Sequence, residues 1–362
     1  MGKRIVIPFG PQHPVLPEPI HLDLVLEDER VVEAIPSVGY VHRGLEKLVE
    51  KRDFRDYVFV AERICGICSF VHCATYCEAV EAVMGVEVPE RAKYLRMVWS
   101  ELSRLHSHLL WLGCFGDAIG FENLFMTAWR LREHILDELE STTGNRVIQG
   151  TAKVGGVRRD ISPEKLDAIV AGLDALAPKL RDLTDVFFDD STVRHRTQGV
   201  GVVSTRDAYD LGAVGPTARG CGVPQDIRTS GYGAYGEVRF SPVVESAGGG
   251  GDCYTRCLVR GREMYASIEI IRQAVEAMPD GPIEVRVAGN PNGEAWVRAE
   301  QPRGEVLHYV KANGTKHLVR HWVRTPTFAH VPFLVSALRG CDFADVPVIV
   351  HSIDPCISCT ER

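Results

Sequence analysis

Two Cys-x-x-Cys pairs near opposite ends of the sequence, Cys65/Cys68 and Cys356/Cys359, constrain the fold most strongly. The two-residue spacer lets both sulfurs of a pair face one metal ion, and thiolates are soft ligands that suit zinc, iron, copper or nickel. A structural zinc site usually takes both pairs from one compact module, with a spacer of roughly 15–20 residues. Residues 69–355 separate the pairs here. The spacing therefore favours a buried metal site that joins the two chain ends, with structural zinc and a redox dithiol as the alternatives.

The chain has 11 cysteines, and those outside the two pairs are interpreted as small core residues, because free cysteine is commonly buried. They are Cys73, Cys77, Cys114, Cys221, Cys253, Cys257 and Cys341. Cys73 and Cys77 also extend the first pair into Cys-x2-Cys-x4-Cys-x3-Cys, so a local iron–sulfur cluster is a less favoured alternative.

Composition and charge exclude several classes of function. Hydrophobic residues make up 45% of the chain and charged residues 25%, which is ordinary for a globular protein. A formal net charge of -7 argues against a partner such as nucleic acid or anionic lipid. The N-terminus lacks the apolar run of a secretory signal, and no segment is apolar enough to span a bilayer. We therefore expect a cytoplasmic protein, for which any connection to a membrane must come through partners.

The spacing of hydrophobic residues predicts a mainly helical centre. Residues 1–36 alternate like a β-hairpin, and from about residue 40 the apolar positions recur at three- and four-residue steps. Long helices are predicted between Pro89 and Gly113, from Pro163 to Phe188 behind the cap Ser162, and from Tyr254 to Met278.

Loops and strands complete the predicted fold. The glycine-rich stretch from Gln198 to Gly251 is predicted to wrap the helices as loops. Strands are predicted at Ile283–Val287 and Val346–Val350, and a hairpin from Val306 to Val323 that turns at Asn313-Gly314.

We therefore expect a mainly α fold with an α+β periphery. In it a central bundle of long helices carries N- and C-terminal β-containing segments that meet at the metal site. The expected regions are an N-terminal β-hairpin region (1–40), a helical core (41–280) with glycine-rich loops at about 198–251, and a C-terminal β-rich region (281–362).

Several other polar residues are interpreted as structural or solvated. His106 and His108 lie on the first long helix and are expected to be packed. A mildly basic hairpin is expected to be a solvated face. Its residues are Lys311, Lys316, Arg320, His321 and Arg324.

Several runs of the sequence resemble the nickel–iron hydrogenase large subunits. Arg43-Gly-Leu-Glu46, Arg55-Asp-Tyr57 and Glu62-Arg-Ile-Cys-Gly-Ile-Cys-Ser-Phe-Val-His72 resemble their N-terminal signature, and Asp354-Pro-Cys-Ile-Ser-Cys359 resembles their C-terminal signature. Gly10-Pro-Gln-His-Pro14 is similar to the membrane-associated, energy-converting branch. That branch includes the Ech-type and carbon-monoxide-induced hydrogenases and the related large hydrophilic subunit of complex I, which lacks the paired cysteines.

The resemblance implies a hydrogenase catalytic subunit that reversibly cleaves and forms H2 at a nickel–iron centre. Cys65 and Cys356 would be terminal nickel ligands, while Cys68 and Cys359 would bridge nickel to an iron that carries carbon monoxide and cyanide. Heterolytic cleavage needs a Lewis-acidic metal and a base within reach. The alternative is a complex I-like structural or coupling subunit whose cysteines bind zinc. A binding module with a redox-switched disulfide is a more distant alternative.

The resemblance also assigns roles around the centre. Arg303 would lean over the iron ligands, where its guanidinium can donate to cyanide nitrogen. Asp354 would pair with a nearby arginine or orient it, and Glu18 would pass protons from the terminal cysteine toward solvent. His72 would donate to a bridging sulfur.

Glu46 matches a glutamate that binds magnesium in many relatives. Those relatives end in a histidine that completes the magnesium site, whereas this sequence has Arg362 there. A magnesium ion at Glu46 and a salt bridge between Glu46 and Arg362 in its place are therefore the two alternatives, of which the salt bridge is favoured.

The resemblance implies partners as well. The sequence shows no clear cluster motif for electron exit, so an iron–sulfur small subunit is expected to carry electrons to a ferredoxin-like carrier. Membrane subunits of a multisubunit complex are expected beside it.

Overall fold

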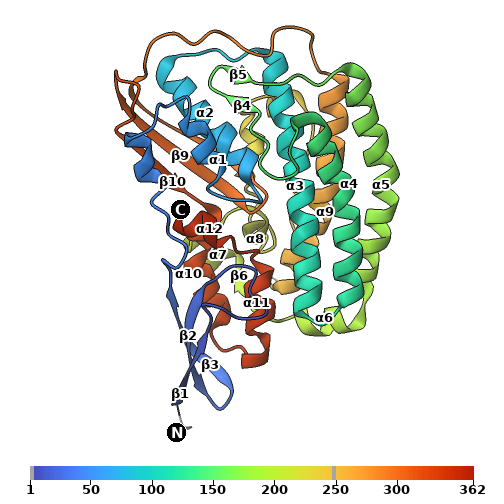
Figure 1. Cartoon of the computed structure of the whole chain (residues 1–362). Coiled ribbons are helices and arrows are strands. Elements are labelled where there is room, and N and C mark those ends of the chain that lie inside the picture. Colours follow the sequence, from blue (N-terminus) through green and yellow to red (C-terminus); the bar gives the residue numbers. More distant parts are fainter. Residues whose placement is uncertain (1–3, 247–249) are drawn as a thin grey trace.

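Four long helices stand side by side on one side of the molecule (Figure 1). α3 (Glu90–Ala118) packs against α4 (Glu122–Thr143) and α9 (Cys253–Glu276), and α5 (Pro163–Asp189) packs against the same two helices. The structure is a computed structural model that describes residues 4–246 and 250–362. The three long helices expected from the sequence are confirmed, and the mixed α/β composition is confirmed as well.

The ends of these helices follow from local sequence. Ser162 caps α5 by accepting a hydrogen bond from the amide of Lys165 at 3.3 Å. Asp252 and Thr255 cap α9 reciprocally, each side chain bonding the other residue's backbone amide. Such caps satisfy amides that have no partner inside the helix, and each contributes about 1 kcal/mol.

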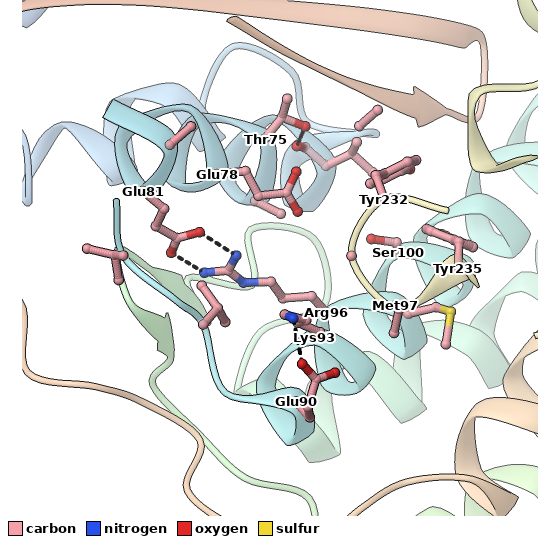
Figure 2. A pocket seen from close by; sticks show the side chains of 18 of the residues that line it. Thr75, Glu78, Glu81, Glu90, Lys93, Arg96, Met97, Ser100, Tyr232 and Tyr235 are labelled. Atoms are coloured by element: carbon pink, nitrogen blue, oxygen red, sulfur yellow. Dashed lines mark hydrogen bonds and ion pairs between the residues drawn. The ribbon is translucent and has the colours of Figure 1, made fainter. Parts of the chain in front are cut away.

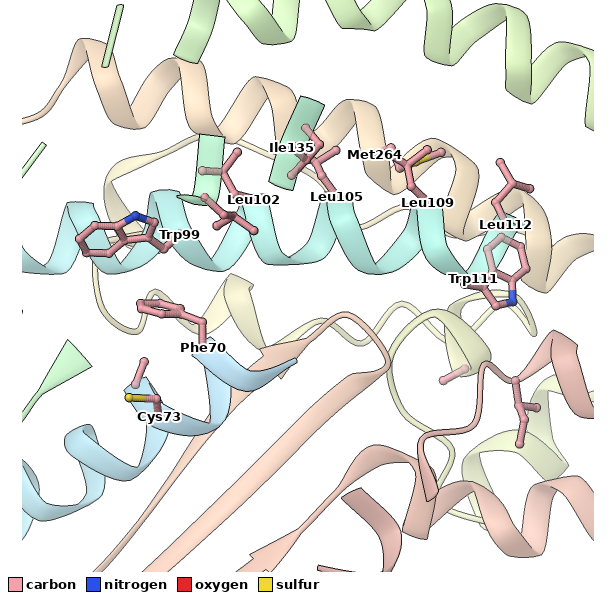
Figure 3. Close-up of a cluster of buried hydrophobic side chains, with 14 of the residues drawn as sticks. Phe70, Cys73, Trp99, Leu102, Leu105, Leu109, Trp111, Leu112, Ile135 and Met264 are labelled. Carbon is pink, nitrogen blue, oxygen red and sulfur yellow. The ribbon is translucent and has the colours of Figure 1, made fainter. Parts of the chain in front are cut away.

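α3 is the helix around which the core is built. Its leucines at three- and four-residue steps are completely buried, and they are Leu102, Leu105, Leu109 and Leu112. Figure 3 shows them in one cluster with Ile135 of α4 and Met264 of α9. The wide buried surface of α3 also packs Trp99 against Phe70, with ring centroids 5.8 Å apart.

Two antiparallel three-stranded sheets lie on the other side of α3. The first contains β1 (Arg4–Phe9), β2 (His21–Glu27) and β3 (Arg30–Ser37) in that order. The second contains β8 (Asn292–Gln301), β9 (Gly304–Asn313) and β10 (Arg320–Arg324), with β9 in the middle. α2 (Ser69–Met84) packs on β8 and β9.

The N-terminal hairpin predicted from the leucine alternation is confirmed. Leu22, Leu24 and Leu26 of β2 are buried while their neighbours are more exposed. The turn uses positive φ angles at Asp28 (51°) and Glu29 (67°), the conformation that suits a two-residue hairpin loop.

The remaining elements are short. The helices are α1 (Tyr57–Glu62), α6 (Ser191–Thr197), α7 (Thr205–Asp210), α8 (Gly215–Arg219), α10 (Pro326–Leu338), α11 (Val346–Ser352) and α12 (Ile357–Glu361). The two-residue strands are β4 (Ala152–Lys153), β5 (Gly156–Val157), β6 (Val203–Ser204) and β7 (Gly250–Gly251). The 3₁₀ helices are η1 (Glu46–Glu50), η2 (Ile227–Ser230), η3 (Tyr235–Glu237) and η4 (Phe343–Asp345).

The strand prediction for Val346–Val350 is wrong, because this segment forms α11. Its four aliphatic residues are fully buried, and a short apolar run of that kind does not distinguish a strand from a buried helix. Pro347 lies in the first turn of α11, where the missing amide proton costs nothing. The segment that leads to the second cysteine pair is therefore helical.

Two other strand predictions also need correction. Ile283–Val287 forms no strand, and only Glu284 makes an isolated bridge, to Gly156. The hairpin of β9 and β10 is confirmed, but its connection runs over residues 314–319 instead of closing at Asn313-Gly314. Isolated apolar runs thus misplaced strands in the C-terminal part, where the strand at Asn292–Gln301 was not predicted.

No helix within the described ranges 4–246 and 250–362 is long and apolar enough to cross a membrane.

The central position of Leu105 predicts a large packing penalty. Replacement Leu105→Ala leaves a cavity between α3, α4 and α9, and we expect the free energy of unfolding to fall by about 2–5 kcal/mol. Denaturant titration followed by circular dichroism measures this change. The control is Val186→Ala on the exposed face of α5, for which we expect a change within about 0.5 kcal/mol. Equal effects of the two substitutions would contradict the packing.

Candidate metal centre

The fold brings the four cysteines of the two pairs together. Sγ of Cys65 lies 3.2 Å from Sγ of Cys356, and Sγ of Cys68 lies 3.4 Å from Sγ of Cys359. All four side chains are at most 1% exposed. The separations exceed a disulfide bond of about 2.05 Å, so the four cysteines are free thiols.

Local backbone structure points the sulfurs of each pair inward. Cys65 and Cys68 lie in the loop before α2, where Sγ of Cys65 accepts from the amide of Ile67 at 3.2 Å and from that of Cys68 at 3.4 Å. Cys356 directly precedes α12 and donates its own amide to Oγ1 of Thr327 at 3.0 Å. Amide protons aimed at a sulfur stabilise its thiolate form.

Hydrogen bonds and burial act in opposite directions on the four thiols. Hydrogen bonds from neighbouring thiols lower the pKa of Cys65 well below its ordinary value and also lower the pKa of Cys356. Burial raises the pKa of Cys68 and of Cys359 well above the ordinary value. A positive ion among the sulfurs would favour the thiolate form of each cysteine and so oppose the effect of burial.

Arg43 ties the two cysteine loops to each other. Its guanidinium donates to the carbonyl oxygens of Arg63 at 3.0 Å and Ile64 at 2.9 Å, just before Cys65. It also donates at 2.9 Å to the carbonyl of Ser358, between the cysteines of the second pair. Sequence analysis placed Arg43 in a signature without giving it this role, because the carbonyl acceptors are distant in sequence.

Arg303 and Asp354 form a buried ion pair beside the cysteines. Nη2 of Arg303 donates to Oδ1 of Asp354 and its Nε donates to the backbone oxygen of the same residue, both at 2.8 Å. Burial alone would lower the pKa of Arg303, but the carboxylate of Asp354 and the nearby thiolates raise it well above its ordinary value. The two residues that sequence analysis associated are therefore in contact. Asp354 adopts a positive φ of 52°, which the double contact with Arg303 supports.

The loop that carries Arg303 is clamped from two sides. Arg104 of α3 donates to the carbonyls of Glu300 at 2.8 Å and Gln301 at 2.9 Å, at the end of β8. On the other side Gly304 packs directly on Gly215, and a Cβ added at Gly215 would lie 2.2 Å from the Cα of Gly304. Both glycines have positive φ angles and leave no room for a side chain.

Glu18 lies against the loop of the second cysteine pair. Its carboxylate accepts from the amides of Ile357 and Ser358 and from the hydroxyl of Ser358. Burial, together with the negative charge of Cys356, raises the pKa of Glu18 to about 7. A carboxyl group with this pKa exchanges protons readily near neutral pH.

His72 lies between the cysteines and a set of buried polar residues. Its Nε2 is 3.3 Å from Sγ of Cys359 and 2.9 Å from Nε2 of Gln301, and its Nδ1 is 3.1 Å from His308. Sequence analysis missed His308 and Gln301. Inward-facing polar residues at the alternate positions of β8 and β9 are the only sequence signal for them.

Glu46 forms an ion pair with Arg362. Nε of Arg362 donates to Oε1 of Glu46 at 2.7 Å, and the same oxygen accepts from the amide of Val323 at 2.9 Å. The expected salt bridge is therefore present. A cation that binds this oxygen of Glu46 would have to displace Arg362.

The structural interpretation of the two helix histidines is consistent with their positions. Nε2 of His106 lies 2.8 Å from the carbonyl of Ile67, inside the first cysteine loop, and His108 lies 3.0 Å from Glu263. The interpretation of His321 as part of a solvated basic face is wrong, because it is only 1% exposed. It points inward from β10 while Lys311 and Arg320 remain exposed.

The other cysteines stay outside the centre. Five are buried as expected (Cys73, Cys77, Cys221, Cys253 and Cys257), while Cys114 and Cys341 are partly exposed. In the part of the chain that the structure describes, only Cys65, Cys68 and Cys359 bring three potential ligand atoms within 4.8 Å of one another, and Cys356 adjoins them. This placement does not favour a local cluster at Cys73 and Cys77.

A cavity of about 610 Å³ lies apart from the cysteines, between α2, α3 and the loop that contains Tyr232 (Figure 2). Figure 2 shows Glu78 pointing into it, beside the ion pair of Glu81 with Arg96 at 2.7 Å. None of the site residues predicted from the sequence lines this cavity.

The donor set at the cysteines fits a soft metal. Four buried sulfurs converge without a disulfide, and no hard oxygen ligand lies among them in the described residues. Such a set suits nickel, iron or zinc and does not suit magnesium or calcium.

Comparison with known protein families matches two descriptions to this chain. The family described as nickel-dependent hydrogenase matches residues 43–113, which contain the first cysteine pair. The family described as respiratory-chain NADH dehydrogenase, 49 Kd subunit, matches residues 118–290 and 285–362, which contain the second pair.

Individual relatives and a solved structure match nearly the whole chain. The membrane-bound hydrogenase subunit alpha of Pyrococcus furiosus is 40% identical, over 99% of this chain and 87% of the relative. The carbon monoxide-induced hydrogenase of Rhodospirillum rubrum is 39% identical, over 98% of this chain and 99% of the relative. A chain in the structure of the membrane-bound sulfane sulfur reductase, an archaeal respiratory membrane complex, is 33% identical with a TM-score of 0.93, over 99% of this chain and 98% of that chain. The chain therefore belongs to the nickel–iron hydrogenase large-subunit family, in the membrane-bound, energy-converting branch that is related to complex I.

Proposed function

We propose that this chain is the catalytic subunit of a hydrogenase, and that Cys65, Cys68, Cys356 and Cys359 hold a nickel–iron centre. The observation that carries the proposal is the convergence of four buried free thiols from the two ends of the chain. The large hydrophilic subunit of complex I, which the sequence also resembles, lacks the paired cysteines. A subunit without metal would have no need to bury four thiols together. The reaction is the reversible cleavage and formation of H2.

The centre, when bound, supplies a Lewis-acidic, redox-active metal with carbon monoxide and cyanide on iron, at which H2 is polarised. Glu18 accepts a proton from the sulfur of Cys356 and passes it toward solvent. Its contacts with Ile357 and Ser358 hold the carboxyl group beside that loop. The pKa of about 7 allows the group both to take and to give up a proton.

Arg303 keeps a permanent positive charge next to the sulfurs. Asp354 holds the guanidinium by two hydrogen bonds, and Nη1 lies 3.5 Å from the hydroxyl of Ser107. This leaves Arg303 with donor capacity for cyanide nitrogen on the iron. Nε2 of His72 lies 3.3 Å from Sγ of Cys359, and with metal bound it would donate to that sulfur and stabilise the thiolate.

The proposed setting is a multisubunit complex on the inner face of the cell membrane. An iron–sulfur small subunit would carry electrons between the centre and a ferredoxin-like carrier, and membrane subunits would anchor the assembly. The relatives named above as membrane-bound hydrogenase and as part of a respiratory membrane complex support such partners.

A coupling subunit whose cysteines bind zinc is the second candidate. The match of residues 118–290 and 285–362 to the 49 Kd subunit family favours it. Metal analysis separates the two candidates, because zinc carries no carbon monoxide or cyanide.

Metal content tests the proposal directly. Protein matured in a hydrogenase-competent host is expected to contain nickel and iron, with infrared bands of iron-bound carbon monoxide and cyanide. Cys356→Ser is expected to lose nickel and H2 turnover, whereas Cys253→Ser, which changes a buried cysteine outside the centre, should retain both. Zinc alone without these bands, or full turnover in Cys356→Ser, would contradict the hydrogenase proposal.

Glu18→Gln tests the proton route. The amide keeps the shape of the side chain but cannot exchange protons, so we expect H2 turnover to fall by about 100-fold or more with metal content unchanged. H2/D2O exchange and elemental analysis measure the two quantities. Glu33→Gln on the exposed side of β3 is the control and should leave turnover unchanged. Unaltered exchange in Glu18→Gln would refute its role as a relay.

The pair of Arg303 with Asp354 predicts strong coupling of two substitutions. Arg303→Met leaves the buried carboxylate of Asp354 unpaired, and we expect the free energy of unfolding to fall by about 3–5 kcal/mol. Adding Asp354→Asn removes that charge and should recover part of the loss. Denaturant unfolding of the two single variants and the double variant gives the coupling energy. Additive effects would show that the two side chains act independently.

A further inference from the structure

Three buried histidines and a tyrosine form a continuous line from Cys359 to the pocket beside the C-terminus. His72 is 3.3 Å from the sulfur through Nε2 and 3.1 Å from Nε2 of His308 through Nδ1. Nδ1 of His308 is 3.0 Å from Nε2 of His321, whose Nδ1 is 3.0 Å from the hydroxyl of Tyr57. We call His72, His308, His321 and Tyr57 the histidine ladder.

Burial keeps the imidazoles of the ladder neutral. The three rings are at most 1% exposed, and loss of solvent lowers the pKa of His321 to about 3 and that of His308 well below its ordinary value. A neutral imidazole donates from one nitrogen and accepts at the other. All hydrogen bonds along the ladder must therefore point the same way.

Tyr57 sets the direction of these hydrogen bonds, and the amide of Gln301 at the other end is oriented to match it. Tyr57 donates its only hydroxyl proton to the carbonyl of Leu45 at 2.8 Å, so its oxygen accepts from Nδ1 of His321. At the other end the amide nitrogen of Gln301 lies 2.9 Å from Nε2 of His72 and makes that nitrogen an acceptor. In this arrangement all three histidines carry their proton on Nδ1.

A metal-bound thiolate at Cys359 requires the opposite direction. The thiolate only accepts, so Nε2 of His72 must carry a proton, and its Nδ1 then accepts from His308. Oε1 of Gln301 is buried and has no hydrogen-bond partner among the described residues. Rotation of the amide turns this oxygen toward the protonated Nε2, so Gln301 can serve either direction.

We propose that Tyr57, His321 and His308 are positioning residues that set the tautomer of His72, and that metal binding at Cys359 reverses every hydrogen bond of the ladder. The inference rests on the proposed function, because it takes Cys359 as a metal ligand. The reversal conserves charge on each ring. Each ring and Tyr57 carry the same number of protons before and after the reversal, and the proton that Cys359 loses on metal binding is the only one released.

The ladder reaches a pocket at His321, one group before its far end at Tyr57. His321 lines a cavity of about 420 Å³ together with Glu46 and Arg362. In the reversed state the Tyr57 hydroxyl donates to His321 and releases the carbonyl of Leu45, which adjoins Glu46. Metal binding at the cysteines thus changes hydrogen bonding next to the C-terminal ion pair, without any change in the position of heavy atoms along the ladder apart from the amide of Gln301.

The test follows the ring nitrogens of the histidines with and without metal. The full chain is labelled with 15N-histidine, signals are assigned from His308→Gln and His321→Gln variants, and spectra are recorded without metal and with Zn²⁺ as a diamagnetic thiolate-binding probe. We expect the protonated nitrogen to change from Nδ1 to Nε2 in both His308 and His321 on zinc binding. If zinc consumes the four thiols and either tautomer stays unchanged, the ladder inference is wrong while the thiolate centre stands. If zinc leaves the thiols free, the proposed centre itself fails.

Two tyrosine variants give a matched comparison that does not depend on activity. Both Tyr57 and Tyr76 contact the ring of His321, with centroids 5.3 Å and 5.2 Å away, but the Tyr76 hydroxyl donates to the carbonyl of Phe54 instead. Tyr57→Phe should therefore leave His321 without a fixed tautomer in the metal-free chain, whereas Tyr76→Phe should leave it on Nδ1. The same spectrum from both variants would overturn the role of Tyr57.

Discussion

The convergence of the two cysteine loops is the constraint on which the rest of the structure depends. It requires the loop before α2 and the last turn of the chain to meet in the interior, away from solvent. Helices α3, α4, α5 and α9 lie on one side of the molecule and the sheet of β8, β9 and β10 lies on the other (Figure 1). The C-terminal Arg362 lies beside β10, where it pairs with Glu46.

Burial of so many polar groups near the sulfurs is costly unless each group finds a partner. Arg43 satisfies carbonyls of both cysteine loops, and Arg104 satisfies those that precede Arg303. Arg303 and Asp354 neutralise each other, so the guanidinium can remain charged beside the thiols. The few atoms left without a partner in the described residues are informative, and Oε1 of Gln301 is one of them. The amide of Gln301 can turn either its nitrogen or its oxygen toward Nε2 of His72.

Sequence reasoning succeeded where a local pattern has one physical solution. Ser162 before Pro163 fixed the start of α5, and alternating leucines fixed the face of β2. It failed at Val346–Val350, where a fully buried run carries no periodicity. It placed His321 in solvent because a short strand of mixed charges does not reveal which face is inward. The proximity of Glu18 to the second cysteine loop was expected only through resemblance, since 339 residues separate Glu18 from Ile357.

The sequence by itself determined the soft donor set, the long helices of the core and the family signature, because each depends on residue type and near-neighbour spacing. Only the tertiary structure decided which groups surround the sulfurs. Arg43 on the loop carbonyls, the pairing of Glu46 with Arg362 and the line of His72, His308 and His321 all join residues that are remote along the chain. Hydrogen-bond direction and burial depend on such contacts, and no local spacing encodes them.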